Sequence, residues 1–411
     1  MTVADHTEAV EPLHLSKSGG YGASSTVGAV VVGGDYQGLG IVRSLGRQKI
    51  PVCVIDDEHS ISRYSRYTTH SITVPDLRDE KRTVDSVLEI GQRLNLRGWV
   101  LYPTREETVA AFARYRSLLS LFFRVPASEW DVTQWCWDKR NTYNKAAELG
   151  IPTPRTWYPK SRDELEQVNG DPPYAVKPAI KENFIYATRV KAWRANNRSE
   201  LREFFDRAAA HVGPGEVMIQ ELIPGGGAQQ FSYCAFFKDG QAIGRMTARR
   251  SRQHPPEFGR SSTFVETIDL PILEELSTRF LSAINYYGLV EMEYKLDQRD
   301  GQYKLLDVNA RTWGYHAIGP SAGVDFPHML FADMIGESVE ARRGRAGVKW
   351  IRLLTDVPTA TLEILKGRRN LWSYLRSMRG IDVESVFSGK DILPGLVELV
   401  RFPYLVVKRG F

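Results

Sequence analysis

Long hydrophobic runs are absent from this sequence of 411 residues, and no stretch of about 18 apolar residues could span a bilayer. The apolar N-terminal segment that a secretory signal needs is missing too. Cysteine is scarce, and Cys53, Cys136 and Cys234 lie far apart without the spacing of metal ligands. These absences argue against a disulfide scaffold and a transmembrane protein, and they predict buried thiols in a cytoplasmic protein.

A strong excess of charge is also absent. The net charge is +5 and the isoelectric point is near 8.9, with 42% apolar and 25% charged residues, as in an ordinary globular protein. Basic residues cluster at 249–252, 342–345 and 366–369 rather than along one helix. This distribution suits small anionic substrates at least as well as nucleic acid, and we expect no nucleic-acid partner. The length suits about three domains, or two domains with decorations.

The N-terminal part alternates between apolar strands and helices. Residues 1–26 are rich in Ser and Gly and predict a disordered leader. An apolar strand then runs into Gly33-Gly34, and a helix and a second strand at 52–55 follow, which predicts a parallel α/β sheet. The glycines match the dinucleotide pattern G-x-G-x-x-G only loosely. A tight strand-to-helix turn is therefore the favoured interpretation, with a nicotinamide-dependent oxidoreductase as a distant alternative.

Polar residues in the stretch 288–311 form the most informative pattern. Two strands joined by a turn at Asp300-Gly301 would pair as a hairpin, with the side chains of each strand alternating between its two faces. The first strand carries two acids and the second carries an acid, an amide and an arginine: Glu291 and Glu293, then Asp307, Asn309 and Arg311. The simplest interpretation of any single acid on a strand is that its side chain faces solvent. Apolar neighbours on the second strand instead indicate a buried face and favour a Mg²⁺ site.

Two lysines and a glycine-rich segment precede this hairpin. Lys139 begins a helix and, taken alone, is a surface charge. Lys177 ends an apolar strand beside Pro178, a suitable place for a phosphate contact. A further strand within 215–226 runs into Pro224 and three glycines, where exposed backbone groups could bind an adenine edge. A plain connection between strands is an equally good interpretation of that segment.

In this order, Lys139, Lys177, the segment 220–223, Glu293 and the segment 307–311 resemble the ATP-grasp superfamily. The chain is most similar to its carboxylate–amine ligases, the group that contains D-alanine–D-alanine ligase and D-aspartate ligase. The resemblance covers residues 28–340 and implies an α/β ATP-grasp fold with a Rossmann-like preATP-grasp domain, a small α+β lid lobe and a larger α+β metal-binding lobe. The implied parts are a leader at 1–26, the preATP-grasp domain at 27–130, the lid region at 131–225, the metal-binding lobe at 226–345 and an extension at 346–411.

The resemblance also implies roles for individual residues. ATP binding falls to Lys139, Lys177, Gln220, Glu221, Ile223 and Gln230, with Gln229 as a close competitor for the ribose position. Glu293, Asp307 and Asn309 are the implied ligands of Mg²⁺, as two ions, with Mn²⁺ as an alternative. Arg311 and Lys177 are the implied catalytic residues, which stabilise the transferring phosphoryl group.

Three departures from the family pattern concern the lid and the ligands. The segment 177–193 has no glycine where many lids carry a Gly/Ser-rich loop, and Lys181, Asn183 or Thr188 are candidates to replace its backbone contacts. Asp307 stands where glutamate is usual, and Gln230 stands where an acid is usual. Both can still bind their expected partners, Mg²⁺ and ribose hydroxyls.

The implied activity is an ATP-dependent ligase that activates a carboxylate as an acyl phosphate and joins it to an amine in an amino acid, a peptide or a cell-envelope precursor. A carboxylase or carbamoyl-forming enzyme and a nucleotide-binding module without turnover are the alternatives. Candidate substrate contacts are Arg250, Arg252, Arg260 and His316, although a solvated loop and a structural histidine are the competing interpretations. We expect the stretch 393–411 to pack on the body, with peripheral membrane contact as the alternative. A homodimer is left open.

Overall fold

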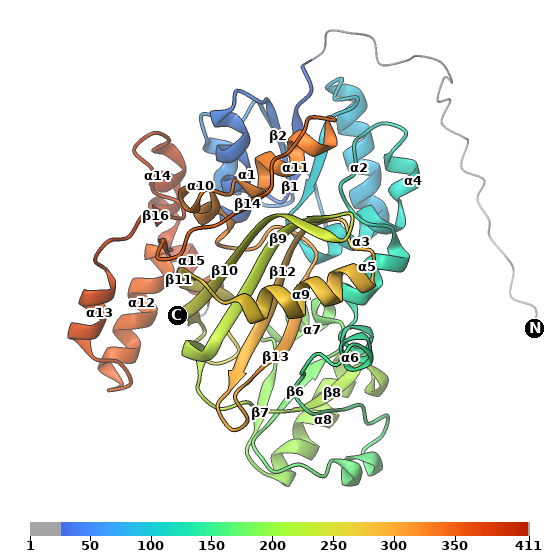
Figure 1. Ribbon diagram of the computed structural model, residues 1–411, viewed down its shortest axis with the longest axis vertical. Helices are drawn as coiled ribbons and strands as arrows, with labels where there is room; N and C mark the ends of the chain where they lie inside the picture. The colour runs from blue at the N-terminus through green and yellow to red at the C-terminus, as the bar shows by residue number, and fades with distance from the viewer. Residues whose placement is uncertain (1–25, 410–411) are drawn as a thin grey trace, which may run out of the picture.

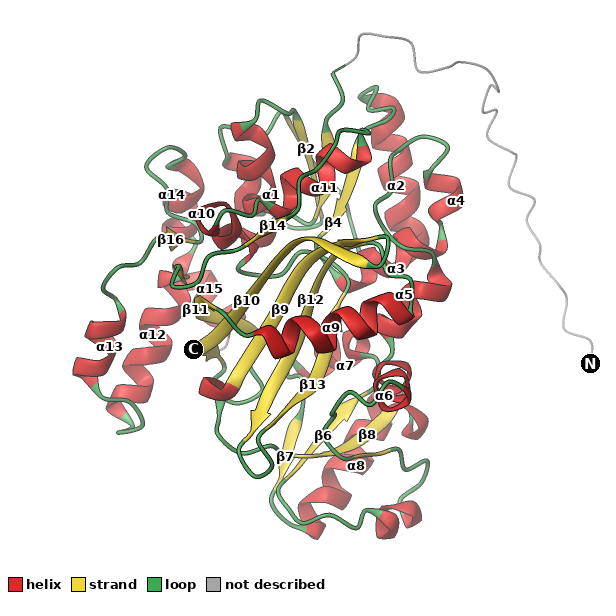
Figure 2. Cartoon of the chain, in the orientation of Figure 1, coloured by secondary structure: helices red, strands yellow, loops and turns green. Residues whose placement is uncertain are grey.

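The computed structural model describes residues 26–409, so the predicted leader lies almost wholly outside the described residues. Three sheets divide these residues into an N-terminal domain, a small lobe and a larger lobe (Figure 1, Figure 2). The N-terminal domain is at the top of Figure 1, the small lobe at the bottom and the larger sheet between them. The last helices of the chain form the left edge of the molecule.

The N-terminal domain is a parallel sheet in the order β3-β2-β1-β4. Val30 and Val32 of β1 enter one core and Ala29 and Val31 enter another, so both faces of the strand are buried. Strands buried on both faces form continuous apolar runs, as this sequence does. The elements are β1 (Ala29–Val32), β2 (Val52–Asp56), β3 (His70–Thr73), β4 (Val100–Pro103), α1 (Tyr36–Arg47), α2 (Glu80–Arg93), α3 (Glu106–Arg114) and α4 (Arg116–Leu119).

The first strand-to-helix turn of this domain explains its glycine pair. Gly33 has a φ of +96°, and a Cβ there would lie 2.0 Å from Thr104 Oγ1. Gly34 N donates a hydrogen bond to Asp56 Oδ2 at 2.6 Å, while Arg105 pairs with the same carboxylate at 2.7 Å. A left-handed backbone in such a crowded place requires glycine. The contacts therefore support the tight-turn interpretation of this segment.

The small lobe, the predicted lid, is an antiparallel sheet in the order β5-β8-β6-β7. Its core is formed by side chains such as Phe184, Leu201 and Phe205, from the two helices that cover the sheet. Asn197 caps the longer helix by accepting a hydrogen bond from Glu200 N. The elements are β5 (Thr156–Trp157), β6 (Tyr174–Pro178), β7 (Trp193–Ala195), β8 (Val217–Glu221), α7 (Lys181–Thr188) and α8 (Arg198–Val212).

The larger lobe is built on an eight-stranded sheet in the order β13-β12-β9-β10-β11-β15-β16, with β14 paired to β10. Its strands are β9 (Gln230–Lys238), β10 (Gln241–His254), β11 (Ser261–Ile268), β12 (Gly288–Asp297), β13 (Gln302–Asn309), β14 (Arg342–Arg343), β15 (Lys349–Ile351) and β16 (Val383–Glu384). The accompanying helices are α5 (Trp130–Trp137), α6 (Lys139–Glu148), α9 (Pro271–Ala283), α10 (Gly319–Ala322) and α11 (Phe326–Met334).

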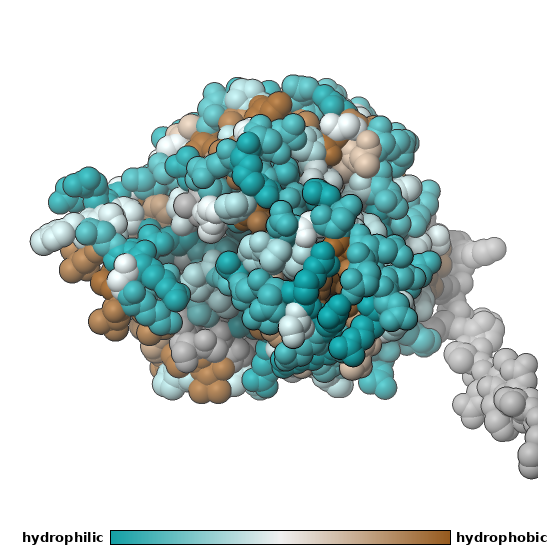
Figure 3. Space-filling view, turned by 90° about the horizontal axis from the view of Figure 1, so that it is seen from below, coloured by the Kyte–Doolittle hydropathy of each residue, from teal (hydrophilic) through white to brown (hydrophobic). Residues whose placement is uncertain are grey.

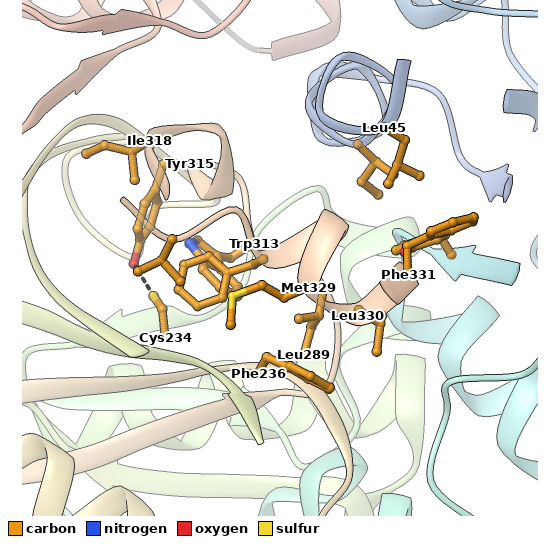
Figure 4. Close-up of a cluster of buried hydrophobic side chains, with 14 of the residues drawn as sticks. Leu45, Cys234, Phe236, Leu289, Trp313, Tyr315, Ile318, Met329, Leu330 and Phe331 are labelled. Carbon is orange, nitrogen blue, oxygen red and sulfur yellow. Dashed lines mark hydrogen bonds between the residues drawn. The ribbon is translucent and has the colours of Figure 1, made fainter. Parts of the chain in front are cut away.

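One hydrophobic core joins the larger lobe to the N-terminal domain (Figure 4). Leu45 of α1 belongs to the same buried cluster as Phe236 of β9, Leu289 of β12 and Phe331 of α11. Trp313, which follows the β12–β13 hairpin, is fully buried in this cluster. Continuous apolar packing of this kind holds the N-terminal strand ends in a fixed position above the hairpin.

The extension predicted at 346–411 is not a separate appendage. Its strands β15 and β16 continue the larger sheet, because Trp350 and Ile351 pair with Val265 and Phe264 of β11. Its helices are α12 (Leu353–Leu365), α13 (Leu371–Ser377), α14 (Leu393–Val400) and α15 (Phe402–Arg409). A buried ion pair of 2.9 Å between Arg43 and Asp391 anchors the segment before α14 to the N-terminal domain. Pro394, Gly395 and Glu398 of α14 are buried against the body. Within residues 26–409, no helix has the length and apolar character of a membrane span.

Candidate active site

The β12–β13 hairpin forms as predicted and brings its polar residues together. In its antiparallel register Glu293 lies opposite Asp307, and Glu291 lies opposite Asn309. Asn309 Nδ2 donates to Glu293 Oε1 at 3.0 Å and to Glu291 Oε2 at 3.3 Å. The amide nitrogen is thereby fixed between the two glutamates, and its oxygen faces the surrounding cations.

Two lysines from different parts of the chain meet Asp307. Lys139 Nζ, at the start of α6, lies 2.6 Å from Asp307 Oδ1. Lys181 Nζ, at the start of α7, lies 3.5 Å from Asp307 Oδ2, 3.2 Å from Asn309 Oδ1 and 3.1 Å from Glu106 Oε1. The helix that replaces the expected glycine-rich loop thus sends a charged side chain into the acid cluster.

Arg250 of β10 pairs with Glu293 and donates from Nε to Ser262 Oγ at 2.8 Å. Burial alone would raise the pKa of Glu293, but the charges of Arg250, Lys191 and Lys181 outweigh it and lower that pKa to about 2. Burial opposes ionisation of Asp307 as well. Lys139 and Lys181 nonetheless hold the pKa of Asp307 well below its usual range. Both carboxylates are therefore ionised at neutral pH.

Glu291 differs from these two acids. Its Oε1 accepts hydrogen bonds from Tyr315 OH at 2.6 Å and from Ser232 Oγ at 3.0 Å. Burial, followed by the neighbouring charge of Glu293, raises the pKa of Glu291 above its ordinary value. A carboxylate satisfied by two hydroxyls is occupied as a structural acceptor. Glu293, which faces the cations, is the better candidate for a metal ligand.

Arg311 lies where β13 ends and points toward the N-terminal domain. One of its terminal nitrogens donates to Glu106 Oε1 at 2.7 Å and lies 3.5 Å from Asn309 Oδ1, while the other donates to Thr312 O at 2.8 Å. The Nε atom of Arg311 is buried without a hydrogen-bond partner among the described residues. Glu106 therefore positions a guanidinium that still has unused donor capacity.

The donor set of the hairpin fits a hard divalent cation. Among the described residues, no group of three His, Cys, Asp or Glu side chains is placed to hold a metal ion. The hairpin instead offers two ionised carboxylates, Glu293 and Asp307, and the amide oxygen of Asn309. Mg²⁺ binds through one or two carboxylates and completes its shell with water and phosphate, so this set is suited to it.

The residues with predicted roles in nucleotide binding lie on the lid side of the hairpin. Lys177 Nζ donates to Tyr143 OH at 3.1 Å, and Tyr143 OH donates to the hairpin carbonyl of Leu306 at 2.8 Å. Burial lowers the pKa of Lys177 to about 8, against the opposing effect of Asp307 and Glu293. Lys177 is thus a half-buried amine near the acid cluster, and it makes no ion pair with the described residues.

The segment 220–223, the predicted adenine contact, forms the end of β8 and the turn after it. Gln220 donates to Thr156 Oγ1 at 2.8 Å, and Ile223 is buried. The Glu221 carboxylate lies 2.9 Å from Arg299 and 3.3 Å from Lys304 of the hairpin, which joins the lid to the larger lobe. Gln230 lies opposite Lys295 on β12, and its buried Oε1 has no hydrogen-bond partner among the described residues. An unpaired buried acceptor at the predicted ribose position suits a hydroxyl donor.

A cavity of about 540 Å³ adjoins the other side of the acid cluster. It is bounded by the strand ends of the N-terminal domain, by α7, by β10 and by the last two helices of the chain. The cavity lining includes basic, acidic and amide side chains of the cluster: Lys181, Lys191, Arg250, Arg311, Glu106, Glu182, Glu291, Glu293 and Asn309. Burial lowers the pKa of Lys191 to about 8. A charged cavity next to the hairpin is suited to a small polar substrate.

Of the four candidate substrate contacts, the structure brings two to this cavity. Arg250 and Arg260 line it. Arg252 instead makes two bonds of 2.7 and 2.8 Å to Asp356 of α12. His316 is buried away from the cavity with Nδ1 2.7 Å from Trp313 O, and burial lowers its pKa to about 4. Arg252 and His316 therefore do not line this cavity, and their role as substrate contacts stays a prediction.

Three residues of the cluster were missed by the sequence interpretation as site residues: Glu106, Glu182 and Lys191. Burial raises the pKa of Glu182 to about 7, and its Oε2 has no hydrogen-bond partner among the described residues. Glu106 belongs to a helix of the N-terminal domain, so only the tertiary fold connects it with Arg311. Lys191 lies in the glycine-free segment, where the unusual charge of KPAIKENFIYATRVKAW was the available signal.

Comparisons with known proteins agree with this architecture. No model of a known protein family matches the sequence. The chain is 21% identical over 301 residues to D-aspartate ligase of Enterococcus faecium (strain Aus0004), which covers 69% of this chain and 70% of the relative. The predicted resemblance to carboxylate–amine ligases is confirmed by this similarity.

Two solved structures share the fold. L-amino acid ligase from Bacillus licheniformis matches 76% of this chain and 75% of its own, with a TM-score of 0.59 and 16% identity. The biotin carboxylase domain of Hydrogenobacter thermophilus 2-oxoglutarate carboxylase, in complex with MgADP, ADP and bicarbonate, matches 79% of this chain and 74% of its own, with a TM-score of 0.63 and 15% identity. These similarities confirm the predicted α/β ATP-grasp fold.

Proposed function

We propose that this chain is an ATP-dependent ligase that activates a carboxylate as an acyl phosphate and joins it to an amine. One observation carries the proposal: Glu293 and Asp307 lie opposite each other as ionised acids and are surrounded by cations from the lid, from α6 and from the larger sheet. A structural hairpin has no need for so many buried charges around two acids. The similarity to D-aspartate ligase supports the same reaction class.

ATP would lie between the lid and the hairpin. Lys139 and Lys177 would contact its phosphates, the segment 220–223 its adenine and Gln230 its ribose. Glu293, Asp307 and Asn309 would hold Mg²⁺, as two ions, with Mn²⁺ as a substitute. The MgADP in the biotin carboxylase domain of similar fold supports this choice. When bound, the metal supplies charge neutralisation at the phosphates.

In the first step, an oxygen of the substrate carboxylate attacks the γ-phosphorus of ATP, the bond to the bridging oxygen breaks and ADP leaves. Arg311, oriented by Glu106, would neutralise charge that develops on the transferring group, together with Lys177. In the second step, the amine nitrogen attacks the acyl carbon, phosphate leaves and the nitrogen loses a proton. Lys181 and its helix α7 would exclude water from the acyl phosphate.

The cavity would hold the acid and the amine. Arg260 and Lys191 both line it, and Lys191 forms no ion pair with the described residues. We assign these two side chains to a substrate carboxylate, with Arg250 holding Glu293 in place. An amino acid, a peptide or a cell-envelope precursor satisfies this chemistry. Arg252 and His316 do not line the cavity, and their partners lie elsewhere.

The test is a release assay for ADP and phosphate in which the acid and the amine are varied independently. The ligase proposal predicts release that requires both substrates and disappears in Asp307→Asn. Release that requires bicarbonate instead of an organic acid would favour the carboxylase alternative. Binding of MgATP without release in any acid–amine pair would favour the nucleotide-binding module.

A further inference from the structure

We propose that helices α12 to α15 dock this protein on the surface of an anionic membrane. We use the term C-terminal apolar face for the exposed apolar side chains of these helices, among them Leu365, Trp372, Leu375, Leu396, Val400 and Val407. Figure 3 shows hydrophobic residues gathered at the left and lower left of the molecule, the side on which Figure 1 places α12 and α13. The proposal is independent of the ligase reaction.

Exposed hydrophobic side chains are concentrated in this part of the chain. Among the described residues, thirteen of the eighteen exposed large hydrophobic side chains lie between 357 and 407. Leu365 is 79% exposed, Trp372 is 73% exposed and Val400 is 82% exposed. Elsewhere such residues are few and scattered, as is normal for a soluble surface. A concentration of this kind marks an interaction site.

Helix α14 is amphipathic, but its charged residue faces the body and its leucines face outward. Its buried residues are Pro394, Gly395 and Glu398, and Glu398 forms a 3.0 Å ion pair with Arg352. Its leucines at 393, 396 and 399 face outward. A helix that only packed on the body would bury its leucines and expose its glutamate. The outward apolar stripe therefore has another partner.

Helix α12 shows the same inversion independently. It buries Thr355, Asp356, Thr359 and Ala360, and Asp356 pairs with Arg252 at 2.7 Å. Leu362 and Leu365 remain exposed on the same helix. In both helices, a buried acid pairs with an arginine of the body and these leucines are exposed. This arrangement indicates an apolar environment outside both helices.

Positive charge accompanies the apolar side chains. Lys366 and Arg368 follow α12, and Arg376 and Arg379 lie at the end of α13, all of them exposed. Lys366, Arg376 and Arg379 form no ion pair with the described residues, and Arg368 has only a 3.7 Å contact with Glu363. Lys and Arg beside an apolar helical face attract anionic lipid, and a tryptophan such as Trp372 is favoured at the bilayer interface.

This charge also decides between a membrane and a second copy of the chain. A two-fold contact through the C-terminal apolar face would bring the same surface of both copies together, including the basic residues at its edge. Like charges opposed across an interface disfavour association. An anionic bilayer complements both the apolar and the basic residues. Docking would also place the active-site cavity beside the bilayer, because Tyr404 and Leu405 of α15 line it.

The test is flotation of the full chain with vesicles of phosphatidylcholine alone and of phosphatidylcholine mixed with phosphatidylglycerol. We expect the protein to float with the mixed vesicles at low salt and to partition several-fold more weakly with phosphatidylcholine alone or at high salt. Absence of flotation with the mixed vesicles would overturn the proposal.

Matched substitutions locate the surface. Leu365→Ser combined with Trp372→Ser should weaken partitioning by about ten-fold or more, because two interfacial side chains are lost. Leu121→Ser, at a site 57% exposed on the N-terminal domain, is the apolar control and should partition like the parent. Lys366→Glu should weaken binding several-fold, whereas Lys160→Glu on the lid should not.

Two results with these variants would contradict the assignment. Equal partitioning of the parent and the double variant would show that membrane binding, if seen, uses another surface. A concentration-dependent dimer in lipid-free solution that the same double substitution dissociates would show that the C-terminal apolar face is an interface between copies of the chain. Thermal unfolding of each variant verifies that the fold is intact.

Discussion

The hairpin and the C-terminal helices both bury charge, but they arrange it differently. At the hairpin, Asp307 is shared between Lys139 and Lys181, and Lys181 also reaches Glu106. In the C-terminal helices, Asp356 pairs with Arg252 through both of its carboxylate oxygens. This closed pair satisfies both charges and holds the scaffold together. The shared cluster leaves donors such as Arg311 Nε unsatisfied, and it borders a cavity, which are properties of a site that receives a ligand.

Arg250 and Arg252 show the same difference, between a shared charge cluster and a closed ion pair, within a single strand. Both are buried on β10, yet Arg250 pairs with Glu293 of the hairpin and Arg252 with Asp356 of α12. The register of β10 against β11 shifts between these two residues and again after Arg252. A bulge of this kind sends side chains two residues apart in different directions. Local irregularity thus separates a site residue from a structural one.

The largest expected effect is at the shared acid. Asp307→Asn keeps the shape of the side chain but removes the charge that Lys139 and Lys181 surround, so we expect turnover to fall by about 10³-fold or more. The measurement is the initial rate of ADP release with saturating acid and amine. Asp300→Asn, in the turn of the same hairpin, is the control and should retain turnover. An Asp307→Asn rate within ten-fold of the parent would contradict the assignment of Asp307 to the metal site.

The two arginines of β10 should separate activity from stability. Arg252→Gln leaves Asp356 buried and uncompensated, so we expect a loss of about 3–5 kcal/mol in the free energy of unfolding with kcat largely kept. Arg250→Gln should lower kcat by about 10²-fold or more, because Glu293 loses its ion-pair partner and is no longer held in position. Denaturant unfolding and steady-state kinetics on both variants check the difference. Similar losses of kcat in both would contradict it.

A smaller effect is expected on the uptake of protons when MgATP binds. Burial depresses the pKa of Lys177 in the folded chain to about 8, from an ordinary 10.5. Between these values the unfolded state binds more protons, so the contribution of Lys177 to stability increases as pH rises from about 8 to 10.5. Phosphate beside this amine would raise its pKa again. MgATP binding near pH 8 should therefore take up protons.

Calorimetry in buffers of different ionisation enthalpy measures this uptake. The Lys177→Met variant, which has no ionisable amine at this position, is the control and should bind MgATP with less proton uptake. Equal uptake in parent and variant, or no dependence on the buffer, would place the phosphates away from Lys177.

The smallest effect is expected on the C-terminal apolar face. Leu396→Ser should change the free energy of unfolding in lipid-free solution by only about 0.5 kcal/mol, because the side chain is already half in water. Thermal unfolding checks this. A loss above about 2 kcal/mol would mean that the leucine is packed in solution, and would remove the distinction between the inverted helix and an ordinary one.

The sequence predicted the parts of the fold that depend on local pattern. The hairpin followed from alternating side chains and the turn at Asp300-Gly301, and its register places Glu293 opposite Asp307. The parallel N-terminal strands followed from their apolar runs. Contacts between residues far apart in the sequence could not be predicted from local pattern. Glu106 reaches Arg311 only through packing between domains, and the bulge at Arg252 depends on the neighbouring strand. The extension also shows no sequence signal that β15 and β16 join the larger sheet.

Transfer of oxygen tests the central claim most directly. With the acid that supports ADP release labelled by ¹⁸O in its carboxylate, the phosphate released in the complete reaction is analysed by mass spectrometry. An acyl phosphate formed at the Glu293–Asp307 site and displaced by the amine predicts one labelled oxygen in each phosphate and one fewer in the product. Unlabelled phosphate, released at the same rate, would show that the shared acid cluster hydrolyses ATP without activating the acid and would contradict the account.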